Sequence, residues 1–493
     1  MGSSLPPWLL QSQFGRTNAF VSEEQKKEVH QYLQIAQDAL HDLRSRINQL
    51  QRQEEGLVAQ VDRCKVAIAP HKRLPADVLR YTFTMCLDEC TTFPLFKNNM
   101  LLVLSQVCSA WRKIAHETSS FWSDITILRD DSEDHFSSPH LQSALDLWVK
   151  CAAGHPLSLR VYDDSRGATL VSPNKRKRFE RFVITLLSCL NYRELKIQID
   201  LLTLLKFKSH IPSHRLRQLE ALSLFGNYSP YLDLDDLFPP GSVFERLTSL
   251  ELNDDWNLRS SHIRSIIPWK NLRRFVLLHP LAPVICLEVL QQTRVLEYCH
   301  IVPANDDTLP VSKSMAEVKR VQVYLQHLRT LRVSSDETRD AEIFIDQLVL
   351  PALECVICGE YNLNVICGGY DLENIQGIQG SILNAVMRLC RRSGGQKVKE
   401  VHIDDSSSLQ FQVLLRSMPH LRVIRFTNST VTFDDDTLEQ LSTGELGPCL
   451  NELEAKFKHD EAKITDMLRR RRECPRALNK EITPTFALKT IHR

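Results

Sequence analysis

The sequence predicts a mixed α/β protein that begins with one long helix, continues through a small all-helical segment and ends in an irregular solenoid of strand–helix repeats. Three observations carry this prediction. Apolar residues recur with a seven-residue period in residues 23–69. Residues 70–123 hold two short apolar stripes at helical spacing. From about Tyr192 onward, a Leu-x-x-Leu-x-x-Leu-x-Leu pattern or a close variant of it recurs.

Residues 23–69 are predicted to form one helix with a coiled-coil seam. One position of the seven-residue period holds Leu33, Leu40, Ile47, Glu54, Val61 and Ile68, and the other holds Val29, Ala36, Leu43, Leu50, Leu57 and Cys64. Glu54 interrupts the seam, Gly56 loosens the helix and Pro70 ends it. The seam can pair two chains or fold back onto its own chain, so a homodimer is one of two alternatives. Residues 1–22 have no periodicity, and we expect a disordered tail there.

The segment 70–123 contains two apolar stripes. Pro75 suits the first position of a helix, where its missing N–H is not needed. The first predicted helix carries its stripe on Val78, Leu79, Phe83 and Cys86, and the second on Leu104, Val107, Cys108, Trp111, Ile114 and Ala115. Such a small core is not stable alone, so its apolar surface needs a partner or a neighbouring domain.

The motif Leu74-Pro75-x-x-Val78-Leu79, followed by Val107-Cys108-x-x-Trp111-Arg112-x-Ile114-Ala115 and Phe121-Trp122, resembles the F-box. The resemblance is best to F-box-like proteins with C-terminal leucine-rich repeats that are common in mushroom-forming basidiomycete fungi. The connection Asp88–Met100 is longer than in a compact F-box, which leaves the position of any helix within it open. An ordinary helical hairpin around a buried Trp is the alternative interpretation.

The resemblance implies a subunit of a Skp1–cullin–F-box (SCF) ubiquitin ligase. The F-box would dock on a Skp1-like adaptor and through it on a cullin, and the repeats would bind a protein substrate of unknown identity. Mapped residue by residue, the Skp1-binding surface would use Leu74, Pro75, Val78, Leu79, Val107, Cys108, Trp111 and Ile114. These are aliphatic and aromatic anchors of the kind that dominate binding energies.

Residues 124–457 are predicted to form a divergent leucine-rich-repeat solenoid, with one strand and one helix in each unit. Successive repeats end at Leu224, Leu252, Leu277, Ile301, Val333, Cys358, Ile403 and Phe426. The long interval between the repeats ending at Cys358 and Ile403 suggests a hidden degenerate repeat. The tail 458–493 is expected to be helical at first and then disordered.

One row of the repeat strands is predicted to recognise substrate. Strand alternation turns the two apolar residues of each Leu-x-Leu inward and the residue between them outward. These outward residues are Ser223, Glu251, Val276, His300, Arg332, Ile357, His402 and Arg425. They would lie side by side as a ribbon, on the concave face if the units curve as leucine-rich repeats do. Its mixed charges suit a protein surface.

Composition and motifs exclude several other functions. Lys and Arg number 61 against 60 Asp and Glu, so the surplus of cations needed to bind nucleic acid is missing. No signal peptide or membrane span is recognisable, and we expect a cytoplasmic or nuclear protein whose 14 cysteines are reduced. The basic run Lys175–Arg178 is either a nuclear signal or a solvated helix start.

No group of residues supports an active site or a cofactor. Cys355 and Cys358 have zinc-like spacing, but residues three apart on a strand point to opposite faces and cannot chelate together. Cys86 and Cys90 lack a second pair of ligands. We therefore expect an adaptor subunit without catalytic activity and without a metal. A leucine-rich-repeat scaffold with no ligase role is the alternative.

Overall fold

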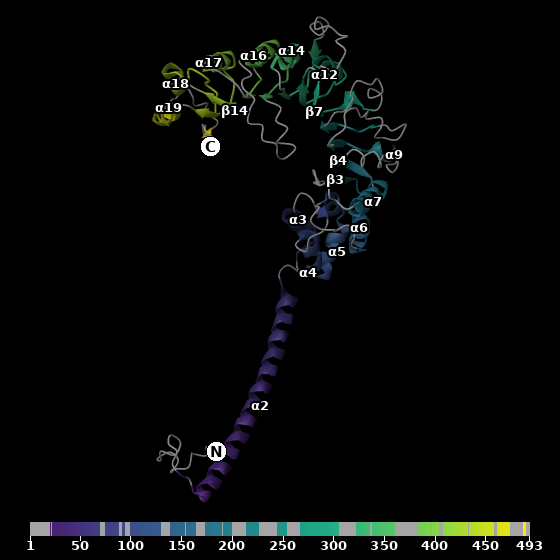
Figure 1. Cartoon of the computed structure of the whole chain (residues 1–493), viewed down its shortest axis with the longest axis vertical. Helices are drawn as coiled ribbons and strands as arrows, with labels where there is room; N and C mark the ends of the chain where they lie inside the picture. Colours follow the sequence, from purple (N-terminus) through teal and green to yellow (C-terminus); the bar gives the residue numbers. More distant parts are fainter. Residues whose placement is uncertain are drawn as a thin grey trace. The chain divides into compact units, whose positions relative to one another are not determined.

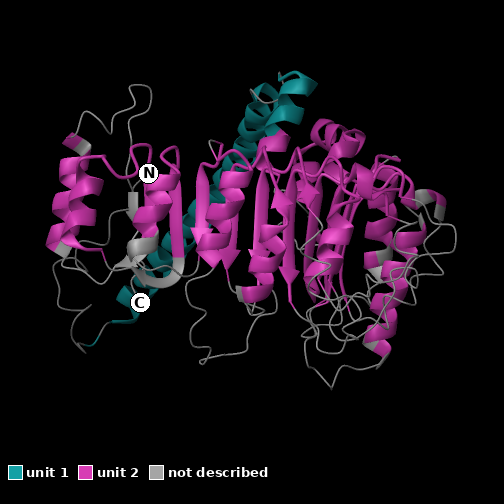
Figure 2. Ribbon diagram, turned by 90° about the horizontal axis from the view of Figure 1, so that it is seen from above, with its two compact units in different colours: residues 1–82 teal, residues 83–493 magenta. Residues whose placement is uncertain are grey.

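The computed structural model of the chain describes Phe20 and residues 22–69, 74–87, 91–93, 99–129, 139–152, 154–163, 173–189, 191–199, 213–225, 244–253, 267–304, 322–335, 338–359, 382–395, 397–403, 408–431, 433–457, 461–473 and 487–489. The expected N-terminal tail lies outside this set, apart from Phe20 and Ser22. The chain divides into two compact units, residues 1–82 and residues 83–493 (Figure 2).

The predicted long helix is confirmed as α2, which spans Glu23–Ile68 (Figure 1). Ser22 and Gln25 form a capping box, in which each side chain bonds the backbone N–H of the other at 3.2 and 3.1 Å. None of the 46 residues of α2 is buried. No helix among the described residues is both long and apolar enough to cross a bilayer.

Three helices follow, α3 (Ala76–Cys86), α4 (Met100–Val107) and α5 (Ser109–Glu117), where two were predicted. The prediction of a single second helix is wrong, because Cys108 adopts an extended backbone conformation and separates α4 from α5. Its Sγ accepts a hydrogen bond from the Trp111 N–H at 3.5 Å and so caps α5. The apolar spacing continues across Cys108, which hid this break.

A 14-stranded sheet runs through residues 83–493, and every strand pair in it is parallel. Its strands are β1 (Thr91–Phe93), β2 (Asp124–Arg129), β3 (Leu157–Asp163), β4 (Tyr192–Gln198), β5 (Ala221–Phe225), β6 (Ser249–Asn253), β7 (Arg274–Leu281), β8 (Tyr298–Pro303), β10 (Thr330–Ser334), β12 (Cys355–Gly359), β13 (Glu400–Ile403), β14 (Val423–Val431), β15 (Glu452–Phe457) and β16 (Ala487–Lys489). A two-stranded sheet joins β9 (Val323–Tyr324) to β11 (Leu348–Val349).

Helices connect many of these strands: α6 (Pro139–Ala152), α7 (Pro173–Cys189), α9 (Ser213–Leu216), α12 (Pro283–Leu290), α14 (Thr338–Asp346), α16 (Ile382–Arg392), α17 (Ser408–Ser417), α18 (Asp435–Ser442) and α19 (Glu461–Glu473), with 3-10 turns η3 (Ser119–Trp122) and η6 (Trp269–Asn271). Within residues 83–493, Figure 1 shows α12, α14, α16 and α17 along the outer side of an arc and the strands on its inner side. The predicted mixed α/β solenoid with a curved parallel sheet is confirmed.

The predicted repeat ends form the core of this solenoid. All eight, from Leu224 to Phe426, lie on strands of the sheet and are buried. The hidden repeat between Cys358 and Ile403 does not add a strand, because β12 pairs directly with β13, Cys358 opposite Ile403. At the other end, the connection Asp88–Met100 contributes β1, which pairs with β2.

Three aromatic residues join the helices α5 and α6 to the first strand. Trp122 donates its Nε1–H to the carbonyl oxygen of Ala115 at 2.8 Å, and Trp148 donates to that of Trp122 at 2.7 Å. The two indole rings lie 4.6 Å apart, and Phe93 of β1 meets Trp148 at 5.2 Å. All three side chains are buried, so this aromatic joint fixes the helices to the sheet.

The C-terminal end of the solenoid is closed by α19 and β16. Residues Ala487–Lys489, expected in a disordered tail, pair with β15. Arg471 of α19 is buried, and its guanidinium donates to the carbonyl oxygens of Leu441, Leu446, Gly447 and Leu450 at 2.5 to 3.4 Å. Arg471 therefore supplies hydrogen bonds to carbonyl groups at the end of α18 and in the loop that follows it.

Arg471→Ala should lower the free energy of unfolding by roughly 2–4 kcal/mol, because it removes a buried guanidinium that donates to four carbonyl groups at once. Chemical denaturation of the full chain measures the change. Arg470→Ala is the matched control, since Arg470 lies on the same helix, is exposed and only pairs with Asp466 at 2.7 Å. Equal stability of the two variants would contradict the structural role of Arg471.

Candidate docking and recognition surfaces

The residues predicted to bind Skp1 divide into exposed and buried groups. Leu74, Val78 and Val107 are 42%, 44% and 49% exposed, and Pro75 is also exposed. Leu79 and Ile114 are buried within the chain. A buried residue can support a docking helix through packing, whereas direct contact with a partner falls to the exposed ones. Their role in docking stays a prediction.

Cys108 and Trp111, the remaining members of that set, are half-buried and have local structural partners. Cys108 caps α5, and the Trp111 ring lies 4.9 Å from the ring of Phe83. Phe83 is fully buried and also meets Phe121 at 6.3 Å. This aromatic contact holds the last turn of α3 against α5.

The structure adds four exposed apolar residues that the sequence did not single out. Tyr81 and Met85 follow Val78 on one face of α3, and Met100 and Val103 precede Val107 on one face of α4. The predicted stripe on α3 mixed two faces, because Leu79 and Phe83 are buried whereas Val78 is not. Val78, Tyr81 and Met85 follow Leu74 by 4, 7 and 11 residues, and this helical spacing was the signal that could have separated the two faces.

The eight predicted outward residues lie side by side on adjacent strands. The register pairs Ser223 with Glu251, Glu251 with Val276, Val276 with His300 and His300 with Arg332. It continues from Arg332 to Ile357, His402 and Arg425. We call this row the recognition row. Its Ser223, Val276 and His300 are buried, which strand alternation alone does not predict. Its part in binding a substrate stays a prediction.

At one end of the row, Arg425 is held by three glutamates that the sequence did not assign to it. Its guanidinium lies 3.2 Å from Glu400, 3.0 Å from Glu452 and 3.3 Å from Glu454. His402 lies 2.6 Å from the same Glu400 carboxylate. Three carboxylates share one guanidinium here, so this group of four side chains carries net negative charge. Arg425 is therefore not available as an unpaired cation.

The middle of the row is cationic and aromatic. The Arg274 guanidinium lies 4.1 Å above the centre of the Tyr298 ring, and these two residues precede Val276 and His300 by two positions on their strands. Arg332 is exposed, and within the described part of the chain it forms no ion pair. This segment of the sheet could accept an acidic group of a partner.

His300 stays neutral beside these two arginines. Its Nε2 lies 3.1 Å from the Ser334 hydroxyl. Burial, and then the charges of Arg332 and Arg274, lower the pKa of His300 from 6.5 to about 3. Below pH 6.5 the unfolded chain therefore binds a proton that the folded chain does not bind until about pH 3.

The unfolding free energy should consequently fall by up to roughly 1.4 kcal/mol per pH unit as the pH drops from 6.5 to 3, from this histidine alone. His300→Gln keeps a polar side chain and removes the titration. Denaturation at several pH values should show a shallower acid decline for the variant than for the wild type. Parallel declines would mean that His300 titrates normally in the folded protein.

Of the paired cysteines in the sequence, Cys355 and Cys358 lie on opposite faces of one strand. Cys358 is buried on the core face of β12, and Cys355 lies half-buried on the opposite face. Burial, with the nearby Glu400 carboxylate, raises the pKa of Cys355 to about 12, which keeps it a thiol. No group of three or more potential metal ligands occurs among the described residues. Cys90 lies outside them.

Comparison with known proteins leaves the family open. No family model matches the sequence, and no curated protein matches it. Among solved structures, the chain resembles one described as "Crystal structure of Rad7 and Elc1 complex in yeast", with a TM-score of 0.36 and 12% identity. The match covers 95% of this chain and 98% of that one. At this TM-score the likeness carries no argument about function.

Proposed function

We propose that the protein is the substrate-receptor subunit of an SCF-type ubiquitin ligase. One observation supports this above all: the Leu-Pro-x-x-Val-Leu motif exposes Leu74 just before α3 and Val78 on α3, and α4 likewise exposes Val107. Isolated exposed side chains are ordinary, but several on one helix face mark a binding surface. A Skp1-like adaptor would cover these faces and connect the chain to a cullin.

The solenoid would capture the protein to be modified. Its recognition row crosses adjacent strands. Near Arg332 the sheet offers a second cation and an aromatic ring, Arg274 and Tyr298, and around Arg425 it carries net negative charge. An extended polypeptide with an acidic residue and, a few residues further on, a basic residue matches this order of charges. The chain would carry out no covalent step, and transfer of ubiquitin would belong to other subunits. The cytoplasm or nucleus is the proposed location.

Co-purification tests this proposal. The full-length tagged chain, expressed in a basidiomycete host, should recover a Skp1-like adaptor and a cullin in near-stoichiometric amounts. Proteasome inhibition should enrich further proteins that the untreated cells lack. Recovery of partners without an adaptor or a cullin would favour the repeat scaffold without a ligase role.

We further propose that two chains associate through α2, whose seam holds no buried residue. Such pairing would present two adaptor-binding faces and two recognition rows in one complex. A substrate with two binding segments would then be held more tightly than either segment alone.

A further inference from the structure

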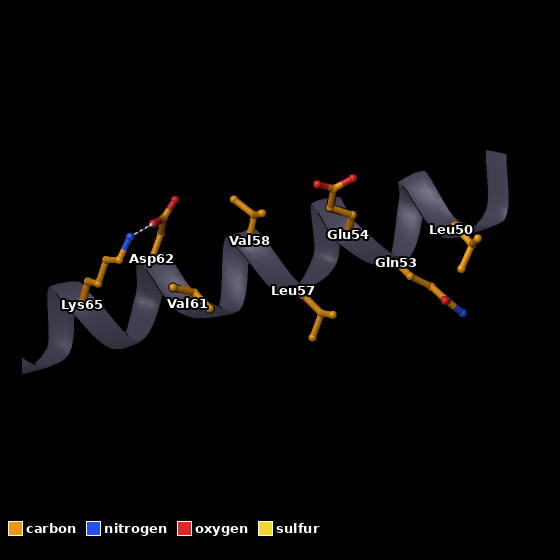
Figure 3. A pocket seen from close by; sticks show the side chains of 8 residues that line it. All are labelled: Leu50, Gln53, Glu54, Leu57, Val58, Val61, Asp62 and Lys65. Carbon is orange, nitrogen blue, oxygen red and sulfur yellow. Dashed lines mark hydrogen bonds and ion pairs between the residues drawn. The ribbon is translucent and has the colours of Figure 1, made fainter. Parts of the chain in front are cut away.

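The seam of α2 is an apolar strip interrupted by Glu54, and the described residues of the chain bury none of it. Eight large aliphatic residues of the seam are between 47% and 70% exposed: Leu33, Leu40, Leu43, Ile47, Leu50, Leu57, Val61 and Ile68. Figure 3 shows part of it. Leu50 and Leu57 leave the helix on one side and Glu54 on the other, and Val61 follows Leu57 along the helix. These two columns of side chains are the two seam positions of a coiled coil.

The strip is large enough for a stable pair. Burying one large aliphatic side chain removes roughly 100 Å² from water. Eight such residues on each of two helices would remove roughly 1,600 Å², which is the usual size of a specific interface. A second copy of the same helix offers this area without any other partner.

The composition of the two seam columns favours a parallel pair. In the later part of the seam, from Leu43 to Ile68, one column holds Ile47, Val61 and Ile68 besides Glu54, and the other holds Leu43, Leu50 and Leu57 besides Cys64. β-Branched residues in the first position with leucine in the second favour two parallel strands. In that arrangement, Arg46 would face Gln51 of the second copy and Gln60 would face its Lys65, so no like charges meet across the flanks.

Glu54 fixes the register of such a pair. With both chains aligned, the two Glu54 carboxylates meet in a single layer, where they repel each other, and the damage is confined to that layer. A shift by one heptad, or an antiparallel pair in full overlap, places each carboxylate in an apolar layer of its own, for example against Leu43 of the second copy. Two layers are then damaged, and a carboxylate among apolar side chains is costly. A polar residue at one seam position specifies register at some cost in stability.

We propose that α2 forms a parallel, in-register coiled-coil homodimer whose alignment is set by Glu54. This inference rests on the self-association proposed above and is independent of any ligase role. A consequence concerns Cys64, an exposed thiol in the leucine column near the end of the helix. In the aligned parallel pair, the two Cys64 thiols lie opposite each other in one layer. In the antiparallel pair, they lie at opposite ends.

Light scattering and mild oxidation of the full-length protein test the inference together. The wild type should have twice the chain mass of 56.7 kDa at micromolar concentration. Leu43→Glu with Leu50→Glu should give a monomer. Ser45→Glu with Gln49→Glu adds the same charge outside the seam and should leave the dimer intact. Glu54→Leu should tighten the dimer about tenfold or more, because it restores an apolar layer.

Diamide converts two thiols to a disulfide while being reduced itself, and it should link two wild-type chains through Cys64. The link should vanish in Cys64→Ser and persist in Cys86→Ser, which removes another exposed thiol. A monomeric wild type would overturn self-association. A dimer that does not cross-link through Cys64 would overturn the parallel register alone. A cross-link that survives in the Leu43→Glu, Leu50→Glu variant would refute pairing of the chains through the seam.

Discussion

Aspartate at both Val78 and Val107 should weaken binding of a Skp1-like adaptor by about a hundredfold or more, while the chain stays folded. Anchors at the centre of an interface each contribute about 2 kcal/mol or more to binding. A carboxylate there must also lose its hydration in the complex. In the free chain, both side chains are nearly half exposed, so the substitutions create no buried charge. Calorimetric titration with purified adaptor measures the loss, and circular dichroism with thermal melting checks the fold.

Leu147→Asp is the matched control, because Leu147 is 40% exposed on α6 and belongs to neither docking helix. It should bind the adaptor as the wild type does. Leu79→Asp should behave differently from all of these, since Leu79 is buried and its replacement should unfold the helices themselves. If the Val78→Asp, Val107→Asp variant still binds at full affinity, docking on these faces is refuted.

Charge reversal should separate the two arginines of the recognition row. Arg425→Glu would place a fourth carboxylate among Glu400, Glu452 and Glu454 and remove the guanidinium that these three share. We expect it to lower the unfolding free energy by roughly 2–3 kcal/mol, because the site is largely shielded from solvent. Arg332→Glu should leave the unfolding free energy within about 0.5 kcal/mol, because Arg332 is exposed and forms no ion pair with the described residues.

The same pair of variants tests substrate recognition. Arg332→Glu should lose captured substrate and keep the adaptor, which proteomic comparison of affinity-purified complexes can measure. Arg332→Gln, which removes the charge without reversing it, should give a smaller loss. Reversing both arginines at once would confuse lost recognition with lost stability. An unchanged set of captured proteins in Arg332→Glu would exclude the cationic middle of the row as a binding site.

Much of the fold was predictable because its elements repeat one simple rule. The heptad period of α2 and the Leu-x-Leu of each repeat strand are local patterns, and burial of the repeat leucines follows from them. The three residues of β1 were not predictable. Thr91–Phe93 are too few to show alternation, and only their pairing with β2 makes them a strand. The break at Cys108 is likewise set by one backbone conformation.

The candidate surfaces were predictable to a lesser degree. Strand alternation indicated which residues of the row share a face, and the parallel register then aligned all eight. It could not reveal that Arg425 is neutralised, since Glu452 and Glu454 come from the next strand and no pattern in the sequence connects them. It also could not show that Val276 and His300 are covered.

The aromatic joint of Phe93, Trp122 and Trp148 holds α5 and α6 at a fixed position relative to the first strands of the solenoid. A flexible linker would leave the distance between the helices and a captured protein variable. A shared core fixes this distance for each strand of the sheet. Neighbouring strands lie about 4.8 Å apart, so the seven steps from β2 to β10 amount to about 34 Å along the arc. If the chain works as proposed, the strand on which a substrate settles decides how far its lysines stand from the transferring enzyme. Changing that strand would change which lysine is modified.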